Sequence, residues 1–314
     1  MKNKILVTGG AGYLGSNLVP MIKDRAIVYD NLLYCNDYFE NVEFVKADVT
    51  DYSTLKKYLE KVDAVVWLAA IVGDAACNVN PEKAYSTNVE ALKYLTDNFE
   101  GKIIFISSCS VYGRNEELVN EKSKLSPISF YAETKIEGEE ILKNKENAFI
   151  LRLGTLHGLS NRMRFDLVVN VLSMHAVVNK KINIFGGKQY RPLLSVKEIA
   201  QVIKKIIDND YIPGIYNIAS ENLSILQVGK HVKNLYPQVK IKYLDSKFED
   251  ERNYKVDISN AKKYLKYKPS IFIDDSIKNI INIIEEGRIK NPFDLKYSNI
   301  SSLANSKEYK NGKK

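Results

Sequence analysis

Residues 4–15, KILVTGGAGYLG, decide the fold of this 314-residue chain. A short apolar run with β-branched residues breaks into glycines and continues as helix-forming sequence, which predicts a strand, a tight turn and a helix start. Gly9, Gly12 and Gly15 let the backbone adopt positive φ and leave room for a pyrophosphate, and the first N–H groups of the helix attract the anion. The stretch therefore predicts a dinucleotide-binding turn, with Tyr13 and Leu14 also against the cofactor.

Composition limits the class of protein. Hydrophobic residues make up 45% and charged residues 27%, as in a globular protein, and the length predicts one large domain with a smaller lobe. The apolar stretches are far shorter than the roughly 18 residues of a membrane span, so we expect a cytoplasmic protein without a membrane partner. The net charge of +8 comes from scattered lysines rather than a basic arm, so we expect a solvated surface and no nucleic-acid partner.

The cysteines predict neither disulfides nor a metal centre. Cys35, Cys77 and Cys109 form no CxxC pair and no ligand cluster with the three histidines. We therefore expect free thiols and no bound metal.

Alternating strands and helices follow the glycine turn. Expected strands cover residues 26–29, 42–46, 62–70, 102–106 and 149–153, and expected helices cover 53–60, 81–99 and a segment from 129. The fold class is therefore α/β, a Rossmann doubly wound parallel sheet with a smaller α/β substrate lobe. We assign residues 1–155 to the first domain and 156–290 to the second, with about 190–210 returning to the large domain. The lysine-rich residues 291–314 are expected to be a frayed tail.

Two features at strand ends specify the cofactor and its chemistry. Asp30, followed by Asn31, ends the second strand where a ribose 2′-hydroxyl is accepted, and its charge would repel a 2′-phosphate, so NAD is favoured over NADP. Tyr131 and Lys135 are four residues apart and share one helical face. The ammonium is expected to lower the pKa of the phenol, which then takes a proton from a substrate hydroxyl.

These motifs, with Val111-Tyr112-Gly113 after a serine-rich strand end, resemble the extended short-chain dehydrogenases/reductases of the NAD-dependent epimerase/dehydratase family, which act on nucleotide sugars. The resemblance covers about residues 1–285. It implies Ser108 as the catalytic hydroxyl with Ser107 as second choice, Lys135 on the cofactor ribose, and Asn88 ordering the site. Further cofactor contacts are expected from Asp48, Val49, Leu68, Ala69 and Ala70.

The second half is expected to hold the substrate. In the family, an asparagine that opens a helix and two arginines bind the nucleotide diphosphate, and Asn170, Arg191 and Arg252 match them; the alternative for each arginine is a surface salt bridge. The run 162–164, Arg-Met-Arg, resembles a subgroup of nucleotide-sugar epimerases and 4-dehydrogenases. His157, a loop residue, stays outside the catalytic set.

The predicted reaction is NAD-dependent oxidation at C4 of a nucleotide-diphosphate sugar, first of all by a 4-epimerase. The alternatives are a 4-dehydrogenase or keto-reductase, and a non-catalytic NAD-binding regulator. Ser108-Cys109-Ser110 replaces the Thr-Asp-Glu of the 4,6-dehydratases, so dehydration is not expected, and Cys109 is interpreted as a small buried thiol. The resemblance also implies a homodimer; the nucleoside and the sugar are left open.

Overall fold

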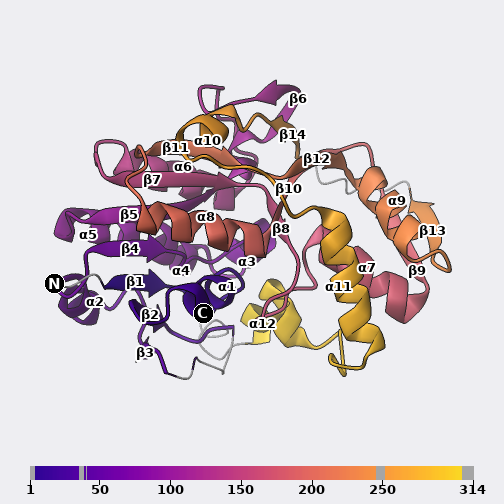
Figure 1. Ribbon diagram of the computed structural model, residues 1–314, viewed down its shortest axis with the longest axis horizontal. Helices are drawn as coiled ribbons and strands as arrows, with labels where there is room; N and C mark the ends of the chain where they lie inside the picture. The colour runs from indigo at the N-terminus through magenta and orange to yellow at the C-terminus, as the bar shows by residue number, and fades with distance from the viewer. Residues whose placement is uncertain (1–3, 35–38, 40, 245–251, 306–314) are drawn as a thin grey trace.

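A computed structural model describes residues 4–34, 39, 41–244 and 252–305. Its central sheet has seven strands, all parallel, in the order β11-β7-β5-β4-β1-β2-β3 (Figure 1). The strands are β1 (Ile5–Thr8), β2 (Ala26–Asp30), β3 (Glu43–Lys46), β4 (Ala64–Trp67), β5 (Lys102–Ser108), β7 (Ala148–Leu153) and β11 (Gly214–Ile218). The predicted doubly wound sheet is confirmed, and its strand order reverses beside β1, where such folds bind ligands.

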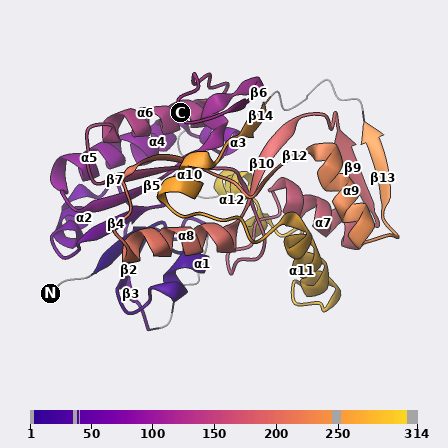
Figure 2. The same cartoon turned by 45° about the horizontal axis from the view of Figure 1, so that its top comes forward.

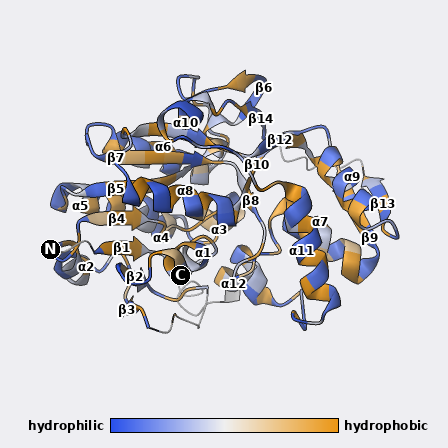
Figure 3. Cartoon of the chain, in the orientation of Figure 1, coloured by the Kyte–Doolittle hydropathy of each residue, from blue (hydrophilic) through white to orange (hydrophobic). Residues whose placement is uncertain are grey.

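Helices cover both faces of this sheet because its strands are buried on both sides. One face carries α1 (Gly15–Leu18), η1 (Val19–Met21), α8 (Val196–Asp208) and α10 (Ser259–Tyr264). The other carries α2 (Tyr52–Leu59), α5 (Ala91–Asn98) and α6 (Phe130–Leu142). Figure 3 shows the apolar colouring of the central strands β1 and β4 between these layers.

The helix expected over residues 81–99 is divided. It consists of α4 (Pro81–Tyr85), a π-helical turn η2 (Ser86–Glu90) and α5. The π-turn contains Thr87 and Asn88, both buried. Such turns are common at functional sites because the extra residue redirects side chains.

The smaller lobe has its own core beside the end of the large sheet (Figure 2). It contains α7 (Val168–Asn179), α9 (Ile225–Leu235), α11 (Ile273–Glu285) and the strand pair β9 (Lys181–Phe185) and β13 (Lys240–Leu244). A three-stranded sheet of β8 (Thr155–His157), β10 (Tyr190–Ser195) and β12 (Glu221–Ser224), and the pair β6 (Arg114–Val119) and β14 (Asn253–Val256), complete the framework. η3 (Cys109–Tyr112) connects β5 to β6.

The segment after residue 291 does not fray as expected. It forms η4 (Leu295–Tyr297) and α12 (Asn299–Asn305), which packs beside α3 (Asp74–Cys77) (Figure 1). Leu303 is fully buried against Ile71 and Tyr131, and this apolar contact holds the helix in place. Residues 306–314 of the tail, and Cys35, lie outside the described part of the chain.

Cys77 and Cys109 are both buried free thiols, as predicted. Among the described residues, no helix combines the length and apolarity that crossing a bilayer requires.

Candidate active site

A pocket of about 1390 Å³ opens at the carboxyl edge of the large sheet, against the smaller lobe. All of the predicted site residues line it except Asn88 and Asn170. Those that line it are Gly9, Gly12, Tyr13, Leu14, Gly15, Asp30, Asn31, Asp48, Val49, Leu68, Ala69, Ala70, Ser107, Ser108, Tyr131, Lys135, Arg191 and Arg252. Residues up to 243 positions apart in sequence therefore face one cavity, from Gly9 to Arg252.

The glycine turn has the shape that a dinucleotide needs. Gly9 has a φ of +68°, and a Cβ there would lie 2.8 Å from the backbone nitrogen of Ala69. At Gly15 a Cβ would lie 2.3 Å from the carbonyl oxygen of Gly10, so the start of α1 packs directly on the turn. Gly12 has more room, with its nearest neighbour, the Gly9 oxygen, at 3.1 Å, and it faces the pocket. Two glycines therefore shape the turn, and the third leaves space for the pyrophosphate.

The end of β2 lines the part of the pocket where the sequence predicts the adenosine ribose. Asp30 accepts hydrogen bonds from the backbone nitrogens of Ala11, at 3.0 Å, and Leu32, at 2.7 Å. Burial raises the pKa of Asp30. Each carboxylate oxygen has a second lone pair, so the orientation of the side chain fits a ribose hydroxyl donor.

Asp48 is fixed in the same region. Its carboxylate accepts from the Thr50 hydroxyl at 2.7 Å and from Asn31 Nδ2 at 2.9 Å, and Lys83 Nζ lies 3.1 Å away. Burial alone would raise the pKa of Asp48, but these partners outweigh burial and lower it. Asp30 and Asp48, which are predicted to contact the adenosine part of the cofactor, are therefore both held in place by hydrogen bonds within the protein.

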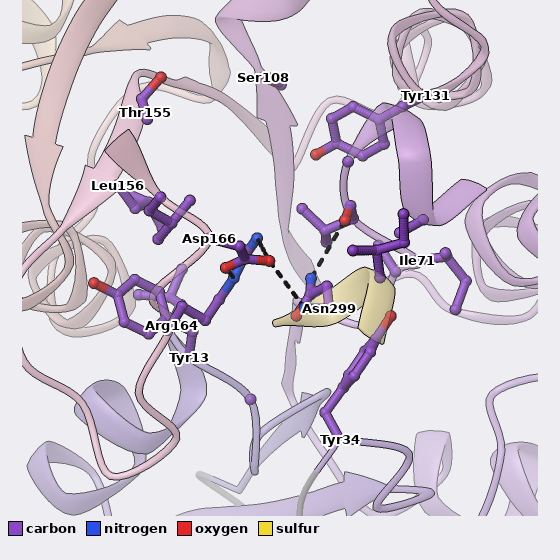
Figure 4. A pocket seen from close by; sticks show the side chains of 18 of the residues that line it. Tyr13, Tyr34, Ile71, Ser108, Tyr131, Thr155, Leu156, Arg164, Asp166 and Asn299 are labelled. Atoms are coloured by element: carbon purple, nitrogen blue, oxygen red, sulfur yellow. Dashed lines mark hydrogen bonds and ion pairs between the residues drawn. The ribbon is translucent and has the colours of Figure 1, made fainter. Parts of the chain in front are cut away.

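Three side chains form the candidate reaction centre. Ser108, at the end of β5, caps η3: its Oγ accepts from the Ser110 nitrogen at 3.1 Å. Tyr131 and Lys135 project from one face of α6, both less than a tenth exposed. Lys135 Nζ donates to the Ile106 carbonyl at 2.8 Å and lies 5.7 Å from the centre of the Tyr131 ring. Figure 4 labels two of these three residues, Ser108 and Tyr131.

The predicted lowering of the Tyr131 pKa is not what the structure shows. Burial raises the pKa of Tyr131, and burial also lowers the pKa of Lys135 to about 8. The ammonium bonds a backbone carbonyl rather than the phenol, so desolvation outweighs its attraction for a phenolate. Tyr131 is therefore a neutral phenol in the protein alone.

A buried ion pair fixes α6, the helix that carries Tyr131 and Lys135, to the sheet. Glu139 follows Lys135 by four residues on the same face of α6, and its carboxylate accepts from Arg152 Nη2 at 2.6 Å and from Nε at 2.9 Å. The Ser107 hydroxyl also donates to Glu139. Ser107, the second choice for the catalytic hydroxyl, is thus engaged in this network. Tyr131, Lys135 and Glu139 follow one another at intervals of four residues, and this repeat is the sequence signal that could have identified Glu139.

Asn88 orders the site as expected, without lining the pocket. Its Oδ1 accepts from the Ile71 nitrogen at 2.8 Å, and its Nδ2 donates to the Ile71 oxygen at 3.1 Å and to Thr134 Oγ1 at 3.2 Å. It therefore joins the loop after β4 to the helix that carries Tyr131.

The side chain of Asn170 is hydrogen-bonded within the protein. It is fully buried, and its Oδ1 accepts from the Gly158 nitrogen at 3.0 Å. Its Nδ2 donates to the Tyr13 hydroxyl at 3.0 Å and to the Arg164 carbonyl at 2.8 Å. Tyr13 in turn donates to the Gly158 carbonyl at 2.6 Å. Both side-chain N–H groups are used in joining the glycine turn to the second lobe, and Asn170 does not line the pocket; its contact with a diphosphate stays a prediction.

The two predicted arginines meet on the far wall of the pocket. Arg191 is 5% exposed, and its Nη1 donates to the carbonyls of Tyr190, at 2.8 Å, and Arg252. Arg252 pairs with Asp74 at 3.3 Å. For Arg191, burial excludes the alternative of a surface salt bridge.

Several pocket residues were not predicted as site residues. Arg164 forms a two-fold ion pair with Asp166, with Nε–Oδ1 and Nη2–Oδ2 distances of 2.8 and 3.0 Å. Asn299, from α12, lies beside this pair (Figure 4). The sequence carried a signal for Arg164 in the Arg-Met-Arg run, but none for Asn299.

His157 is a buried residue rather than a polar loop residue. It is fully enclosed on β8, its Nδ1 lies 2.8 Å from Ser276 Oγ, and burial lowers its pKa to about 3. Within the described residues, no group of three His, Cys, Asp or Glu side chains could hold a metal ion.

The chain is similar to several known proteins. An uncharacterized UDP-glucose epimerase of Bacillus subtilis is 29% identical over 88% of this chain and 96% of its own. A UDP-glucuronate 4-epimerase of Thermodesulfobacterium geofontis is 28% identical over 90% and 96%. The solved UDP-N-acetylglucosamine 4-epimerase of Methanobrevibacter ruminantium, in complex with UDP-N-acetylmuramic acid, superposes with a TM-score of 0.78 at 26% identity, over 90% of this chain and 98% of that one.

The model of one family matches residues 5–219, well over half of the chain. The predicted resemblance and its NAD cofactor are thereby confirmed at the level of the family. The chain belongs to the NAD dependent epimerase/dehydratase family.

Proposed function

We propose that this protein oxidises C4 of a nucleotide-diphosphate sugar with NAD and, as a 4-epimerase, returns the hydride to the opposite face. The observation that carries the proposal is that Ser108, Tyr131 and Lys135 face the same pocket as the glycine turn, with Arg191 and Arg252 on its other wall. Hydride-transfer groups and diphosphate-binding groups thus enclose one space.

The residues fit the cofactor that the family implies. Gly12 leaves space for the pyrophosphate, Asp30 is oriented toward a ribose hydroxyl, and Lys135 is available to the second ribose. When bound, NAD supplies the acceptor for a hydride. Arg191 and Arg252 can bind the oxygens of the substrate diphosphate, because guanidinium forms paired hydrogen bonds with them.

The chain's own residues handle the proton. Ser108 offers a hydroxyl to the sugar oxygen. Tyr131 is a neutral phenol in the protein alone, so it must first lose its own proton to solvent when the complex with cofactor and substrate forms; the phenolate then takes the proton of the sugar hydroxyl that is oxidised. Burial raises the pKa of Tyr131. Its phenolate is therefore a strong base, and its phenol holds the proton until the sugar takes it back. In an epimerase the same Tyr131 returns this proton, so the cycle consumes no acid or base.

The strand end supports oxidation rather than elimination of water. Cys109 stands in the Ser-Cys-Ser run, where its thiol is fully buried and donates to the Arg152 carbonyl at 3.2 Å. Burial raises its pKa strongly, so it is neither an acid nor a nucleophile toward the pocket.

The test incubates purified protein with UDP-, GDP- and dTDP-sugars and follows NADH absorbance and product stereochemistry. UDP-sugars come first because the similar proteins above are named for them. We expect inverted sugar without net NADH, and loss of turnover by about 100-fold or more in Tyr131→Phe with NAD binding retained. Net NADH would instead identify a 4-dehydrogenase. If no sugar in the panel bound or reacted, the proposed substrate class would be wrong.

We also propose a homodimer in solution, which sedimentation of the purified protein would test.

A further inference from the structure

The C-terminal helix α12 contributes a polar group to the pocket. Asn299 is 5% exposed and lines the cavity, although it lies 133 residues beyond Asp166 and 227 beyond Val72, its two hydrogen-bond partners. Figure 4 shows it between Asp166 on one side and Ile71 on the other. One residue near the chain end thus lies between the two lobes, close to the reaction centre.

The backbone nitrogen and the side-chain nitrogen of Asn299 both have partners. Its backbone nitrogen donates to Asp166 Oδ2 at 2.9 Å, and its side-chain Nδ2 donates to the Val72 carbonyl at 3.3 Å. Because the Val72 carbonyl can only accept, the amide orientation is fixed and Oδ1 is the remaining atom. Oδ1 is buried without a hydrogen-bond partner in the described structure.

An acceptor in this position needs a donor. Buried polar atoms are nearly always paired, and an unpaired one in a pocket wall indicates a partner that binds there. Asp166, which accepts from the Asn299 nitrogen and is paired with Arg164, is a carboxylate and has no proton to donate to Oδ1. A sugar hydroxyl or amide N–H in the cavity would supply one.

The position of α12 connects this acceptor to the sugar rather than to the nucleotide. Leu303, one turn after Asn299, packs in the same apolar cluster as Tyr131 and Ile71. The helix is also held to the loop before α7, because the Phe165 nitrogen donates to the Tyr297 carbonyl at 2.9 Å and their rings meet at 5.3 Å. Asn299 is therefore rigidly placed on the side of the pocket that Tyr131 defines.

We propose that Asn299 is a sugar-recognition residue: its Oδ1 accepts a hydrogen bond from a hydroxyl or amide N–H of the substrate's sugar. The inference rests on the proposed nucleotide-sugar function. It gives a specificity role to Asn299, which lies 80 positions after residue 219, where the family match ends.

The experiment compares wild type, Asn299→Ala and, as the matched control, Ser302→Ala. Ser302 lies on the same helix and donates to the Leu295 carbonyl, outside the pocket lining. Thermal melting first establishes that the variants fold. Binding of UDP-glucose, GDP-mannose and dTDP-glucose is then measured beside UDP, GDP, dTDP and NAD.

For Asn299→Ala we expect about tenfold weaker binding of the accepted nucleotide sugar, with binding of the free diphosphate and NAD within twofold of wild type. Ser302→Ala should match wild type throughout. Monodeoxyfluoro analogues of that sugar add a readout that a purely structural role would not change. Wild type should bind one analogue about tenfold more weakly than the parent sugar, and Asn299→Ala should not discriminate between them.

Unchanged sugar binding in Asn299→Ala would overturn the inference, and so would an equal loss for the free diphosphate, which would mean that the residue only holds α12 in place. If wild type bound none of the nucleotide sugars, the proposed function itself would fail, and the inference with it.

Discussion

The buried ion pair between Arg152 and Glu139 gives the sharpest test of how α6, the helix that carries Tyr131 and Lys135, is held. Both side chains are less than a twentieth exposed, and two guanidinium nitrogens face the carboxylate, the closest at 2.6 Å. Arg152→Met leaves Glu139 as a buried carboxylate that still accepts from the Ser107 hydroxyl. Removing one partner of a buried pair costs about 3–5 kcal/mol, because the other charge is left uncompensated.

For a chain of this size each kcal/mol changes the melting temperature by a few degrees, so Arg152→Met should lower it by roughly 6–15 °C. The double variant Arg152→Met/Glu139→Leu removes both charges, and replacing a buried pair by apolar residues is often neutral, so it should recover most of the loss. Scanning calorimetry or melting by circular dichroism is applied to wild type, to the two single variants and to the double variant, which together form a double-mutant cycle.

The control is the next residue of α6. Glu140 pairs with Lys143 at 3.0 Å, but the two side chains are 62% and 66% exposed, and such surface pairs contribute about 0–1 kcal/mol. Glu140→Ala should therefore lower the melting temperature by at most about 2 °C. The reasoning would be refuted if Arg152→Met were no worse than Glu140→Ala, or if the double variant lost as much as both single variants together.

Two further predictions concern the cofactor half. Gly15→Ala should destabilise the fold by about 1–3 kcal/mol, because its Cβ would meet the Gly10 carbonyl oxygen at 2.3 Å. Gly12→Ala should instead melt nearly like wild type and bind NAD more weakly. Thermal melting measures the stability of each variant, and titration with NAD measures its affinity. Burial lowers the pKa of Lys135 to about 8, so if its ammonium donates to the cofactor, binding requires a proton above that pH. The NAD dissociation constant of cofactor-free protein should then rise about tenfold per pH unit above 8, and a flat profile, or the same slope in Lys135→Met, would contradict this role.

The cofactor half was predictable because its signals are local in sequence. The glycine turn, the acid at the end of β2 and the Tyr131–Lys135 pair each occupy one element or one connection, so periodicity and spacing place them. Their environment was not predictable: the pKa of Tyr131 is set by burial among Ile71, Cys77 and Leu303, which three separate segments supply. The same spacing of four that identified Lys135 also contained Glu139, whose partner Arg152 only the fold reveals.

The substrate half was harder because its residues are defined by contacts across the chain. Asn170 had the residue type and position expected of a diphosphate ligand, yet its partner Tyr13 lies 157 residues earlier and occupies its amide. Asn299 had no motif at all, and the lysine-rich sequence after it favoured a frayed end.

Asn170 and Asn299 differ in whether all their side-chain polar atoms have partners within the protein. Asn170 has all its groups bonded to protein and joins the lobes, which fixes the width of the pocket between the glycine turn and the second half. Asn299 joins the lobes as well, through Asp166 and Val72, but keeps one acceptor unbonded at the pocket wall. An amide whose capacity is exhausted supports the site, whereas one with a buried acceptor left over can also select what enters it. If Asn299 recognises the sugar as proposed, the sugar end of the pocket depends on contacts that α12 makes across the chain, whereas the glycine turn is fixed by its own backbone.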